Sequence, residues 1–473
     1  MQRIKSLSIL ILFLAALLQG RQGNAQSDSA LGPLAFFQAV SLNHPLVKQA
    51  GFLTEAAQQE LLMSRGIFDP KLSAGFQNKT FDGKNYYNFF NPELKIPTWP
   101  GIELKAGLER NVGQNLSSSD ITPGNGLQYL GLGLPLAQGL MTDARRTVLK
   151  QAKIGIELAD ADKVKEINKI IFSAAKDYWE WYFAWEQLRN AEVAYRLALE
   201  RYNAVKRRVG VGDLAPIDSV EAHIFFQDRD IFLRQSQMEE RQSRQNLSAY
   251  LWSSDGQPAD LTSAARPELP LAFQTPVSDS LLTQLQSLAK TQHPEIRKLN
   301  FKIDILNLDR KLALEMFKPS LNLNYSLLSG SDQGFFSGVS PERSYKLGLD
   351  FAFPLLLRKE RGKLGMVKTK IFQTNLERTQ TLRNIEIGIS NSFIEIKNLE
   401  SQIQLQNQMV SNYQRLRDGE LKKFANGESS LFLINSREGK LIEGQIKLAN
   451  LISKYQKGRA GIYYNAGRNP LTP

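Results

Sequence analysis

The chain contains three histidines and no cysteine, so it has few of the side chains that metal sites and acid–base catalysts use. Imidazole and thiolate groups are the usual ligands of zinc, and histidine is the most frequent general acid or base. The histidines are His44, His223 and His293, and neither a Ser, His and Asp set nor a metal-ligand spacing accompanies them. The sequence therefore predicts no catalytic residue, no metal site and no bound cofactor, and it disfavours an exported enzyme.

Two of these histidines belong to a repeat. His44-Pro45 returns as His293-Pro294, and the proline of Asp69–Leu72 returns in Lys318–Leu321; both pairs are displaced by the same 249 positions. Proline fits the first turn of a helix, so each His-Pro step predicts a helix start rather than a ligand. A duplicated unit of helix, strands and long helices cannot close a core alone, which predicts stacking into a larger body.

The first 25 residues predict a secretory signal peptide. Arg3 and Lys5 form its basic region, Ile9–Leu18 is apolar, and small residues at 23–25 precede the expected cleavage site. The apolar run is about ten residues, too short for a membrane-spanning helix, although a retained anchor is the alternative. No later stretch reaches the roughly 18 apolar residues that such a helix needs. We expect an exported protein without disulfides, without a lipidated cysteine and without a helical membrane span.

The formal charge of the chain is +12, and Arg3, Lys5 and Arg21 of the predicted signal contribute three of these charges. A basic chain is a reason to consider nucleic-acid binding. Here, however, the basic residues are interleaved with Glu and Asp along helical patterns instead of forming one patch, which is typical of solvated helix faces. The sequence predicts no nucleic-acid partner.

Two regions, 71–135 and 320–354, have the two-residue alternation of β-strands. The alternating segments are Leu72–Gln77, Glu103–Asn111, Leu127–Leu134, Leu321–Leu327 and Tyr345–Phe353. Alternating strands of about nine to eleven residues with turn-rich connections are typical of a transmembrane β-barrel, although half-buried strands of soluble sheets alternate too.

A very long helical hairpin is predicted after each strand region, at 139–253 and at 358–466. The last helix carries apolar residues seven positions apart, and this sustained repeat predicts helices that supercoil around one another. Those residues are Ile434, Leu441, Leu448, Tyr455 and Ile462. A helix from 139 to 209 would be roughly 105 Å long. The hairpins are expected to turn at glycine-containing tips near 210–213 and 425–428.

Two aromatic clusters accompany these elements. The first is explained equally well by a girdle at a membrane interface and by a packed cluster in an external loop. Its members are Tyr86, Tyr87, Phe89, Phe90 and Trp99. The second cluster lies in the first long helix, where packing between helices is favoured over a ligand platform. Its members are Tyr178, Trp179, Trp181, Tyr182 and Trp185.

These patterns divide the chain into a first repeat, 26–253, and a second repeat, 278–467. A proline-rich linker at 254–277 joins them, and a short tail at 468–473 follows.

The order and spacing of these features resemble the TolC-like outer membrane efflux proteins, also called outer membrane factors. The matching features are the two Pro-led helix starts, the strand-to-helix junctions at Pro135 and Pro354, and the first tip, where Asp218 follows Gly212 by six residues. The resemblance covers essentially the whole chain after the signal peptide. No single motif is decisive, but the order and spacing of all of them are specific.

The resemblance implies an α+β membrane protein built as a homotrimer from an internally duplicated chain. An outer-membrane β-barrel would be continued by a long antiparallel coiled-coil α-helical barrel that extends into the periplasm. Such proteins are passive exit ducts of tripartite efflux or type I secretion systems, so the implied partners are a periplasmic membrane-fusion adaptor, an inner-membrane pump and outer membrane lipid. The alternative is a periplasmic coiled-coil scaffold or adaptor without a pore, which would need compact soluble β modules instead of hairpins that lead into long helices.

The number of barrel strands is left open by the sequence. Strands of one chain cannot close a barrel, and an unclosed edge cannot lie in lipid, so several chains must contribute. Four strands per chain would give twelve in a trimer. The segments Tyr86–Ile96 and Ile102–Arg110 could add a further pair, which would either join the barrel or cap it outside.

The resemblance also assigns candidate site residues. The barrel-to-helix junctions are placed at Pro70, Pro135, Pro319 and Pro354.

Acidic residues that often follow the second tip in the family are replaced by Leu433 and Ser436, six and nine positions after Gly427. Asp218 and Glu221 occupy the corresponding offsets after Gly212. An apolar constriction at Leu433 could gate by dewetting.

Basic residues precede the second tip. Lys422 and Lys423 could pair with Asp218 and hold the periplasmic mouth closed, or these side chains are simply solvated tip charges.

Overall fold

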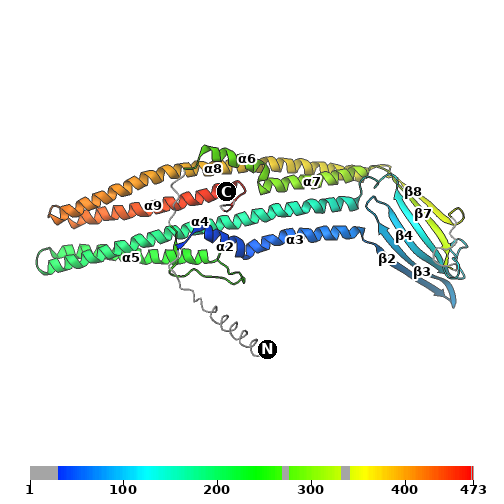
Figure 1. Cartoon of the computed structure of the whole chain (residues 1–473), viewed down its shortest axis with the longest axis horizontal. Coiled ribbons are helices and arrows are strands. Elements are labelled where there is room, and N and C mark those ends of the chain that lie inside the picture. Colours follow the sequence, from blue (N-terminus) through cyan, green and yellow to red (C-terminus); the bar gives the residue numbers. More distant parts are fainter. Residues whose placement is uncertain (1–29, 269–275, 332–340, 470, 472–473) are drawn as a thin grey trace, which may run out of the picture. The chain divides into compact units, whose positions relative to one another are not determined.

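The computed structural model describes residues 30–268, 276–331, 341–469 and 471, so the predicted signal peptide at 1–25 lies outside the described residues. The chain forms two compact units, and each takes segments from both halves of the sequence. The sheet unit contains Gln49–Glu166 and Ser287–Ile387, and the helical unit contains the segments before, between and after these (Figure 1).

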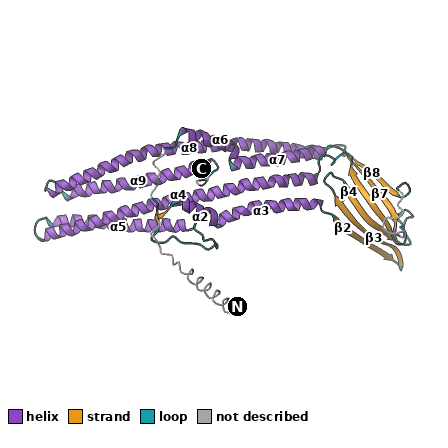
Figure 2. Ribbon diagram, in the orientation of Figure 1, coloured by secondary structure: helices purple, strands orange, loops and turns teal. Residues whose placement is uncertain are grey.

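Most of the described residues are helical (Figure 2). The helices are α2 (Pro33–Asn43), α3 (Pro45–Arg65), the short 3-10 helix η1 (Gly66–Phe68), α4 (Ala144–Gly210), α5 (Pro216–Ser248), α6 (Asp279–Gln292), α7 (Pro294–Glu315), α8 (Arg358–Ala425) and α9 (Leu431–Asn465).

The predicted long helical hairpins are confirmed. Helices α4 and α8 have 67 and 68 residues, and each is followed, after a short turn, by an antiparallel partner, α5 or α9. Of the residues seven apart in α9, Ile434, Leu441, Tyr455 and Ile462 are buried. The seven-residue repeat therefore marks the face of α9 that packs within the helical unit, as the sequence predicted.

The two His-Pro steps separate helices in the same way. His44 lies between α2 and α3 with φ −62° and ψ 129°, and His293 lies between α6 and α7 with φ −59° and ψ 129°. The sequence predicted the helices that begin at the prolines. It did not predict α2 and α6, which precede them.

Six strands form one antiparallel sheet in the sheet unit, in the order β2-β3-β4-β5-β7-β8. The strands are β2 (Lys71–Phe81), β3 (Lys84–Pro97), β4 (Glu103–Val112), β5 (Leu127–Pro135), β7 (Ser320–Gly330) and β8 (Tyr345–Ala352). A separate two-stranded pairing joins β1 (Ala30–Leu31) to β6 (Arg266–Pro267).

All the strands that the alternation predicted are present, and the further pair, β3 and β4, lies inside the sheet between β2 and β5. This pair therefore belongs to the same sheet as the other four strands, and its place in a barrel wall stays a prediction. The sheet is open: within the described residues, β2 pairs only with β3, and β8 pairs only with β7.

The sheet has one apolar and one polar face, because residues that are partners across the ladder point to the same side. The apolar face carries Leu72, Ala74, Phe76, Phe90, Leu94, Ile96, Leu104, Ala106, Leu130, Leu132, Leu323, Tyr325, Leu347, Leu349 and Phe351. The polar face carries Lys71, Ser73, Gln77, Asn91, Glu93, Lys95, Glu103, Lys105, Asn322, Asn324, Ser326, Lys346 and Asp350. Many residues of the apolar face are exposed in the single chain.

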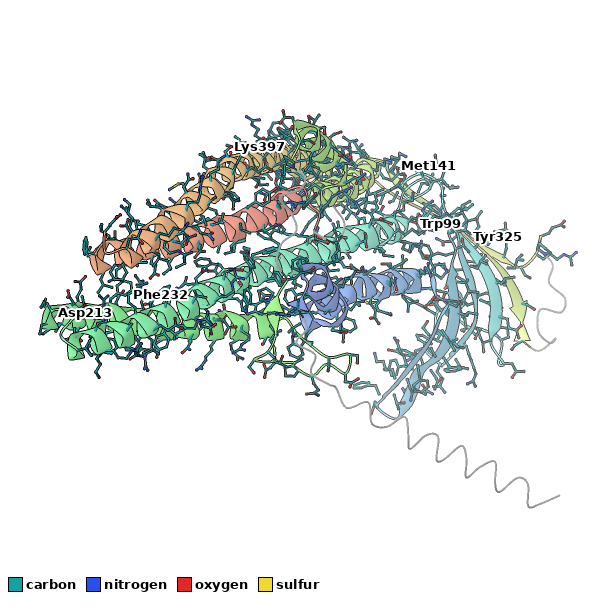
Figure 3. The ribbon with its side chains drawn as sticks, turned by 60° about the vertical axis from the view of Figure 1, so that its left-hand side comes forward. Trp99, Met141, Asp213, Phe232, Tyr325 and Lys397 are labelled. Carbon is teal, nitrogen blue, oxygen red and sulfur yellow. The ribbon has the colours of Figure 1, made fainter. Side chains whose placement is uncertain are left out.

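The aromatic cluster of the first strand region lies mainly on β3. Phe90 is on the apolar face, whereas Tyr87 and Phe89 stack on the polar face with ring centroids 4.6 Å apart. Trp99 lies in the turn after β3, where its ring centroid is 5.7 Å from that of Phe68 (Figure 3). Tyr86, Tyr87, Phe89 and Phe90 therefore belong to a strand and not to an external loop.

The aromatic cluster of α4 packs in the core of the helical unit, as predicted. Tyr178 and Trp181 are fully buried, and Tyr178 stacks on Phe36 of α2. The polar groups of both side chains are hydrogen-bonded. The Tyr178 hydroxyl donates to the carbonyl of Leu31 at 2.7 Å, and Trp181 Nε1 donates to Glu240 at 3.2 Å. Buried aromatic residues with satisfied polar atoms are structural, so this cluster offers no ligand platform.

Among the described residues, no helix has the length and apolar character needed to cross a membrane.

Candidate functional site

The four junction prolines lie where strands meet helices in the sheet unit. Pro70 and Pro319 directly precede β2 and β7, Pro135 ends β5, and Pro354 follows β8 by two residues. Proline fixes φ and removes a backbone donor, which suits the end of a strand ladder. Their predicted role as junctions between a barrel and its helices stays a prediction.

Backbone hydrogen bonds join the segment that follows β5 to the start of β7. The N–H groups of Leu136 and Gln138 donate to the carbonyls of Leu321 and Pro319 at 2.7 and 3.1 Å. Gly139 N–H donates to the buried carboxylate of Glu315 at 3.3 Å. The strand–helix connections of the two halves of the chain are therefore held together.

A buried arginine fixes the start of α4. Asp143 accepts from the backbone N–H of Arg146 at 2.7 Å, which is the contact of a helix N-cap. The Arg146 guanidinium donates to the carbonyls of Gly139 and Leu140 and pairs with Asp143 at 3.3 Å. The segment between β5 and α4 is thus tied to the first turn of the helix.

The turn between β3 and β4 is anchored to the segment that joins β5 to α4. Gly101 has φ +89°, and a Cβ at this position would lie 3.5 Å from the Gly139 carbonyl and 3.6 Å from Pro135. Glu103, the first residue of β4, pairs with Arg145 at 3.0 Å. These residues line an open, polar pocket of about 380 Å³ beside the junction.

The two tips of the helical hairpins have the same backbone geometry. Gly212 and Gly427 have φ +80° and +81°. Each donates to the carbonyl three residues earlier, at 3.0 Å, and the following residue donates to the carbonyl five residues earlier, at 2.9 Å. This is the Schellman motif, in which a left-handed residue closes the helix end. Asp213 beside Gly212 marks the α4–α5 tip (Figure 3).

Asp218 has a local partner at the first tip. Its carboxylate accepts from the backbone N–H of Ala215 at 3.1 Å and so caps the start of α5. Among the described residues, no ion pair joins Asp218 to Lys422 or Lys423 within one chain. Glu221 is exposed on the same helix. The paired-charge hypothesis therefore stays a prediction about an assembly of several chains.

At the second tip, Glu420 holds the turn closed. It accepts from the Ser429 hydroxyl at 2.6 Å and lies 3.5 Å from Arg437. The Ser429 hydrogen bond, together with Arg437 and Lys423, lowers the pKa of the Glu420 carboxyl. This residue was not among those predicted, although it lies within three positions of Lys422 and Lys423.

Leu433 and Ser436 lie in the first turns of α9, and both are exposed. Ser430 caps this helix by accepting from Leu433 N–H at 3.4 Å. The structure thus leaves the apolar side chain of Leu433 available at the tip, as a dewetting constriction would require.

An ion pair missed by sequence reasoning joins the two hairpins of the helical unit. Arg201 of α4 donates twice to the carboxylate of Glu438 of α9, at 2.6 and 2.9 Å, and to Asn435 at 2.7 Å. The Arg201 and Glu438 side chains are only 15% and 7% exposed. Their sequence separation of 237 positions hides the pair from any local pattern.

His44 and His293 act as structural caps. His44 Nδ1 accepts from Leu46 N–H and His293 Nδ1 accepts from Glu295 N–H, both at 3.2 Å. Burial lowers the pKa of both imidazoles, and the pKa of His293 falls to about 4. The prediction that each His-Pro step starts a helix is confirmed. Within the part of the chain that the structure describes, no three His, Asp or Glu residues gather as a metal site would require.

One face of α5 is apolar and uncovered in the single chain. Its large side chains, seven residues apart, are between 51 and 68% exposed: Ile217, Ile224, Ile231 and Met238. The opposite face of α5 contributes the buried residues Ala222, Ser236 and Leu247. A helix with apolar residues on both faces needs a second partner besides α4.

The chain matches known proteins in its structure and not in its sequence. No protein-family model matches the chain, and no curated protein sequence matches it. Several solved structures do match. The CmeC outer membrane channel of Campylobacter jejuni matches with a TM-score of 0.63 and 15% identity, over 92% of this chain and 85% of that one.

Two further structures agree. The outer membrane protein VceC of Vibrio cholerae has a TM-score of 0.64 and 15% identity, over 92% of this chain and 96% of that one. The open state of the MtrE outer membrane channel of Neisseria gonorrhoeae has a TM-score of 0.67 and 14% identity, over 93% and 89%. The chain therefore has the fold of the TolC-like outer membrane channels, which its sequence had predicted.

Proposed function

We propose that this protein is the outer-membrane exit duct of a tripartite efflux or type I secretion system. It would be a passive conduit without catalysis, with its sheet in the outer membrane and its helices in the periplasm. The observation that carries this proposal is the two-faced sheet, whose strands lead through four proline junctions directly into very long paired helices. The likeness to outer membrane channels supports it.

The sheet needs other copies of the chain. In the hydrocarbon region every backbone polar group must be paired, and the free edges of β2 and β8 would leave rows of groups unpaired. Closing the sheets of three copies into one barrel removes all edges, places the apolar face against lipid and turns the polar face to a water-filled lumen. We infer a homotrimer.

The helices also point to neighbouring copies. The uncovered face of α5 (Ile217, Ile224, Ile231 and Met238) matches the seven-residue spacing of supercoiled helices. In a closed helical tube, this face would pack against the α8–α9 hairpin of the next copy. A periplasmic adaptor and an inner-membrane pump would then dock at the tips around Gly212 and Gly427, where Leu433 could narrow the opening.

An internal duplication would account for the paired geometry. The two His-Pro steps have nearly the same φ and ψ, and the two tips have the same Schellman hydrogen bonds. Two structural repeats in each of three chains would line such a tube with similar hairpins.

The test is negative-stain electron microscopy of the protein extracted with detergent from membranes, after expression with its own signal. We expect three-fold particles longer than about 100 Å with a central channel, since α4 alone has about this length. Water-soluble protein, or particles without three-fold symmetry and a lumen, would overturn the channel and favour a pore-less periplasmic scaffold.

A further inference from the structure

The strand pair β3–β4 is built into the sheet along its whole height. Partners in the ladder between β2 and β3 run from Lys71↔Lys95 to Phe81↔Lys84, and β3 pairs with β4 down to Pro97↔Glu103. The β3–β4 turn is closed by Thr98, whose N–H and hydroxyl both donate to the Ile102 carbonyl, at 2.9 and 2.7 Å.

This turn also reaches the junction that leads into α4. Gly101 fits against Pro135 and Gly139, and Glu103 pairs with Arg145. The pair β3–β4 therefore spans the same distance as the strands that continue into helices. A hairpin hanging from the sheet would have no reason to be tied into this junction.

The apolar face is continuous over this pair. Leu72 of β2 is opposite Leu94 of β3, Leu94 is opposite Ala106 of β4, and Ala106 is opposite Leu130 of β5. A strand pair that projected into water would gain nothing from a matching apolar face. The two added strands are therefore suited to the same lipid contact as the other four.

The free edges lie at β2 and β8. All 11 residues of β2 are exposed, and β8 is exposed along almost all of its length. β2 leaves the helix side of the sheet and β8 returns to it, so β8 of one copy and β2 of the next would meet antiparallel. Every pairing inside the sheet has this direction.

The register of the sheet also suits a tilted barrel wall. One row of ladder partners crosses the polar face from Lys71 through Lys95, Lys105, Gly131 and Ser326 to Lys346. This row starts at the helix-side end of β2 but meets β8 six residues before that strand's helix-side end, Ala352.

The stagger gives a strand tilt. Six residues are about 20 Å along a strand, and five steps between strands are about 24 Å across the sheet. If the helix-side ends lie at one level, the strands are inclined by about 40° to the barrel axis, within the range of outer-membrane barrels.

We propose that three copies close into a barrel of eighteen strands, six from each chain, with β8 of one copy paired to β2 of the next. This inference rests on the proposed function, since it specifies how the channel's wall is built. Because barrel diameter grows roughly in proportion to strand number, the outlet is about half as wide again as one made from four strands per chain. Barrels of this strand number leave an aqueous channel.

Cross-linking tests the pairing directly, because introduced cysteines are the only thiols in the chain. With the stagger above, Phe351 lies opposite Leu72 or Ala74 of the next copy. The double variants Leu72→Cys with Phe351→Cys and Ala74→Cys with Phe351→Cys are oxidised in membranes and run on a denaturing gel. We expect covalent dimers and trimers from at least one variant, and their loss on reduction.

Two matched variants complete the test. Leu321→Cys with Phe351→Cys joins direct partners of β7 and β8 within one chain, and should give cross-linked monomer only. Leu104→Cys with Phe351→Cys reports a twelve-stranded wall in which β4 is the edge and β2–β3 lies outside. Covalent trimers from this variant would overturn the eighteen-stranded barrel.

The results distinguish a wrong strand number from a wrong proposed function. Three-fold particles in the microscope without any β2–β8 link would overturn the eighteen-stranded barrel but leave the channel standing. Absence of three-fold particles would overturn both. Three-fold particles together with the β2–β8 link support both, and the barrel diameter measured in the same images should then be about half as wide again as that of a twelve-stranded barrel.

Discussion

Buried polar side chains fix the two hairpins of the helical unit against each other at separate points. Ser453 of α9 donates to the Trp179 carbonyl at 2.6 Å, and Asn168 of α4 donates to the Gly467 carbonyl at 2.7 Å. Arg201 and Glu438 add a third point. Leaving such a buried group unpaired costs about 1–3 kcal/mol, so these contacts set the register of α4 against α9, which apolar packing alone would allow to slide.

Truncation of Glu438 should destabilise the helical unit strongly. Glu438→Ala leaves the Arg201 guanidinium largely buried without its carboxylate, at a cost of about 3 kcal/mol. The thermal denaturation midpoint in detergent should fall clearly, and the double variant Arg201→Met with Glu438→Leu should recover part of the loss. Glu443→Ala, which removes an exposed pair with Lys440, is the control and should change stability by less than about 1 kcal/mol. Equal effects of the two truncations would contradict this role.

The buried His293 should make stability depend on pH. Its pKa is lowered to about 4 by burial, against the attraction of Glu295 and with a small contribution from Lys165. The unfolded chain takes up this proton near pH 6.5 and the folded chain only near pH 4, so the stabilisation is complete above 6.5 and is lost as pH falls towards 4.

The loss should reach about 3 kcal/mol at most. His293→Asn keeps a side-chain acceptor for the Glu295 N–H but does not titrate. We expect the denaturation midpoint of the original protein to fall between pH 7 and pH 5 by more than that of the variant. Parallel pH profiles would show that His293 does not contribute.

At the scale of the elements, the hairpin tips depend on two left-handed residues. Gly212→Ala and Gly427→Ala meet no neighbouring atom within 4 Å, so any effect comes from the positive φ alone. Each should cost about 1 kcal/mol and lower the denaturation midpoint. Gly210→Ala and Gly419→Ala are matched controls, since these glycines are helical and equally unobstructed. They should be neutral or slightly stabilising. A loss at the controls equal to that at the tips would exclude backbone strain as the cause.

Most elements could be predicted from local patterns, because strand alternation and the seven-residue helical repeat are properties of neighbouring residues. The helix starts at His44-Pro45 and His293-Pro294 were found from another local signal, since proline fits the first turn of a helix. The strand count was left open, since Asn88 on the apolar face and Tyr87 and Phe89 on the polar face interrupt the alternation of β3. Only the ladder with β2 and β4 identifies β3 as a full strand of the sheet.

The tip site was predictable only in part. Asp218 was singled out from its spacing, but a carboxylate at the third position of a helix is equally suited to capping α5 and to pairing with another chain. The Arg201–Glu438 pair could not be found, because each residue alone resembles an ordinary charged position on a helix surface. The partner of each residue is defined by the packing of helices that lie far apart in the sequence.

For the whole molecule, assembly should depend on the uncovered face of α5. Ile224→Glu places a charge in the centre of this face, which is exposed in one chain but would be buried in the trimer. We expect a large loss of trimer with little effect on the fold of the single chain. Gln227→Glu introduces the same charge at an exposed polar position of the same helix and should leave the trimer intact. Native gel electrophoresis of detergent extracts measures both, and retention of trimer by Ile224→Glu would contradict the packing.

The two free edges of the sheet also have a genetic consequence. A chain that lacks Lys84–Val112, and with them β3 and β4, would still carry the edges β2 and β8 and could enter trimers with full-length chains. Mixed barrels would have unequal wall segments whose stagger no longer matches around the ring. If both forms are made in one cell, only a minority of trimers contain full-length chains alone. Such a deletion should therefore be dominant over the intact gene, whereas a simple loss of expression would be recessive.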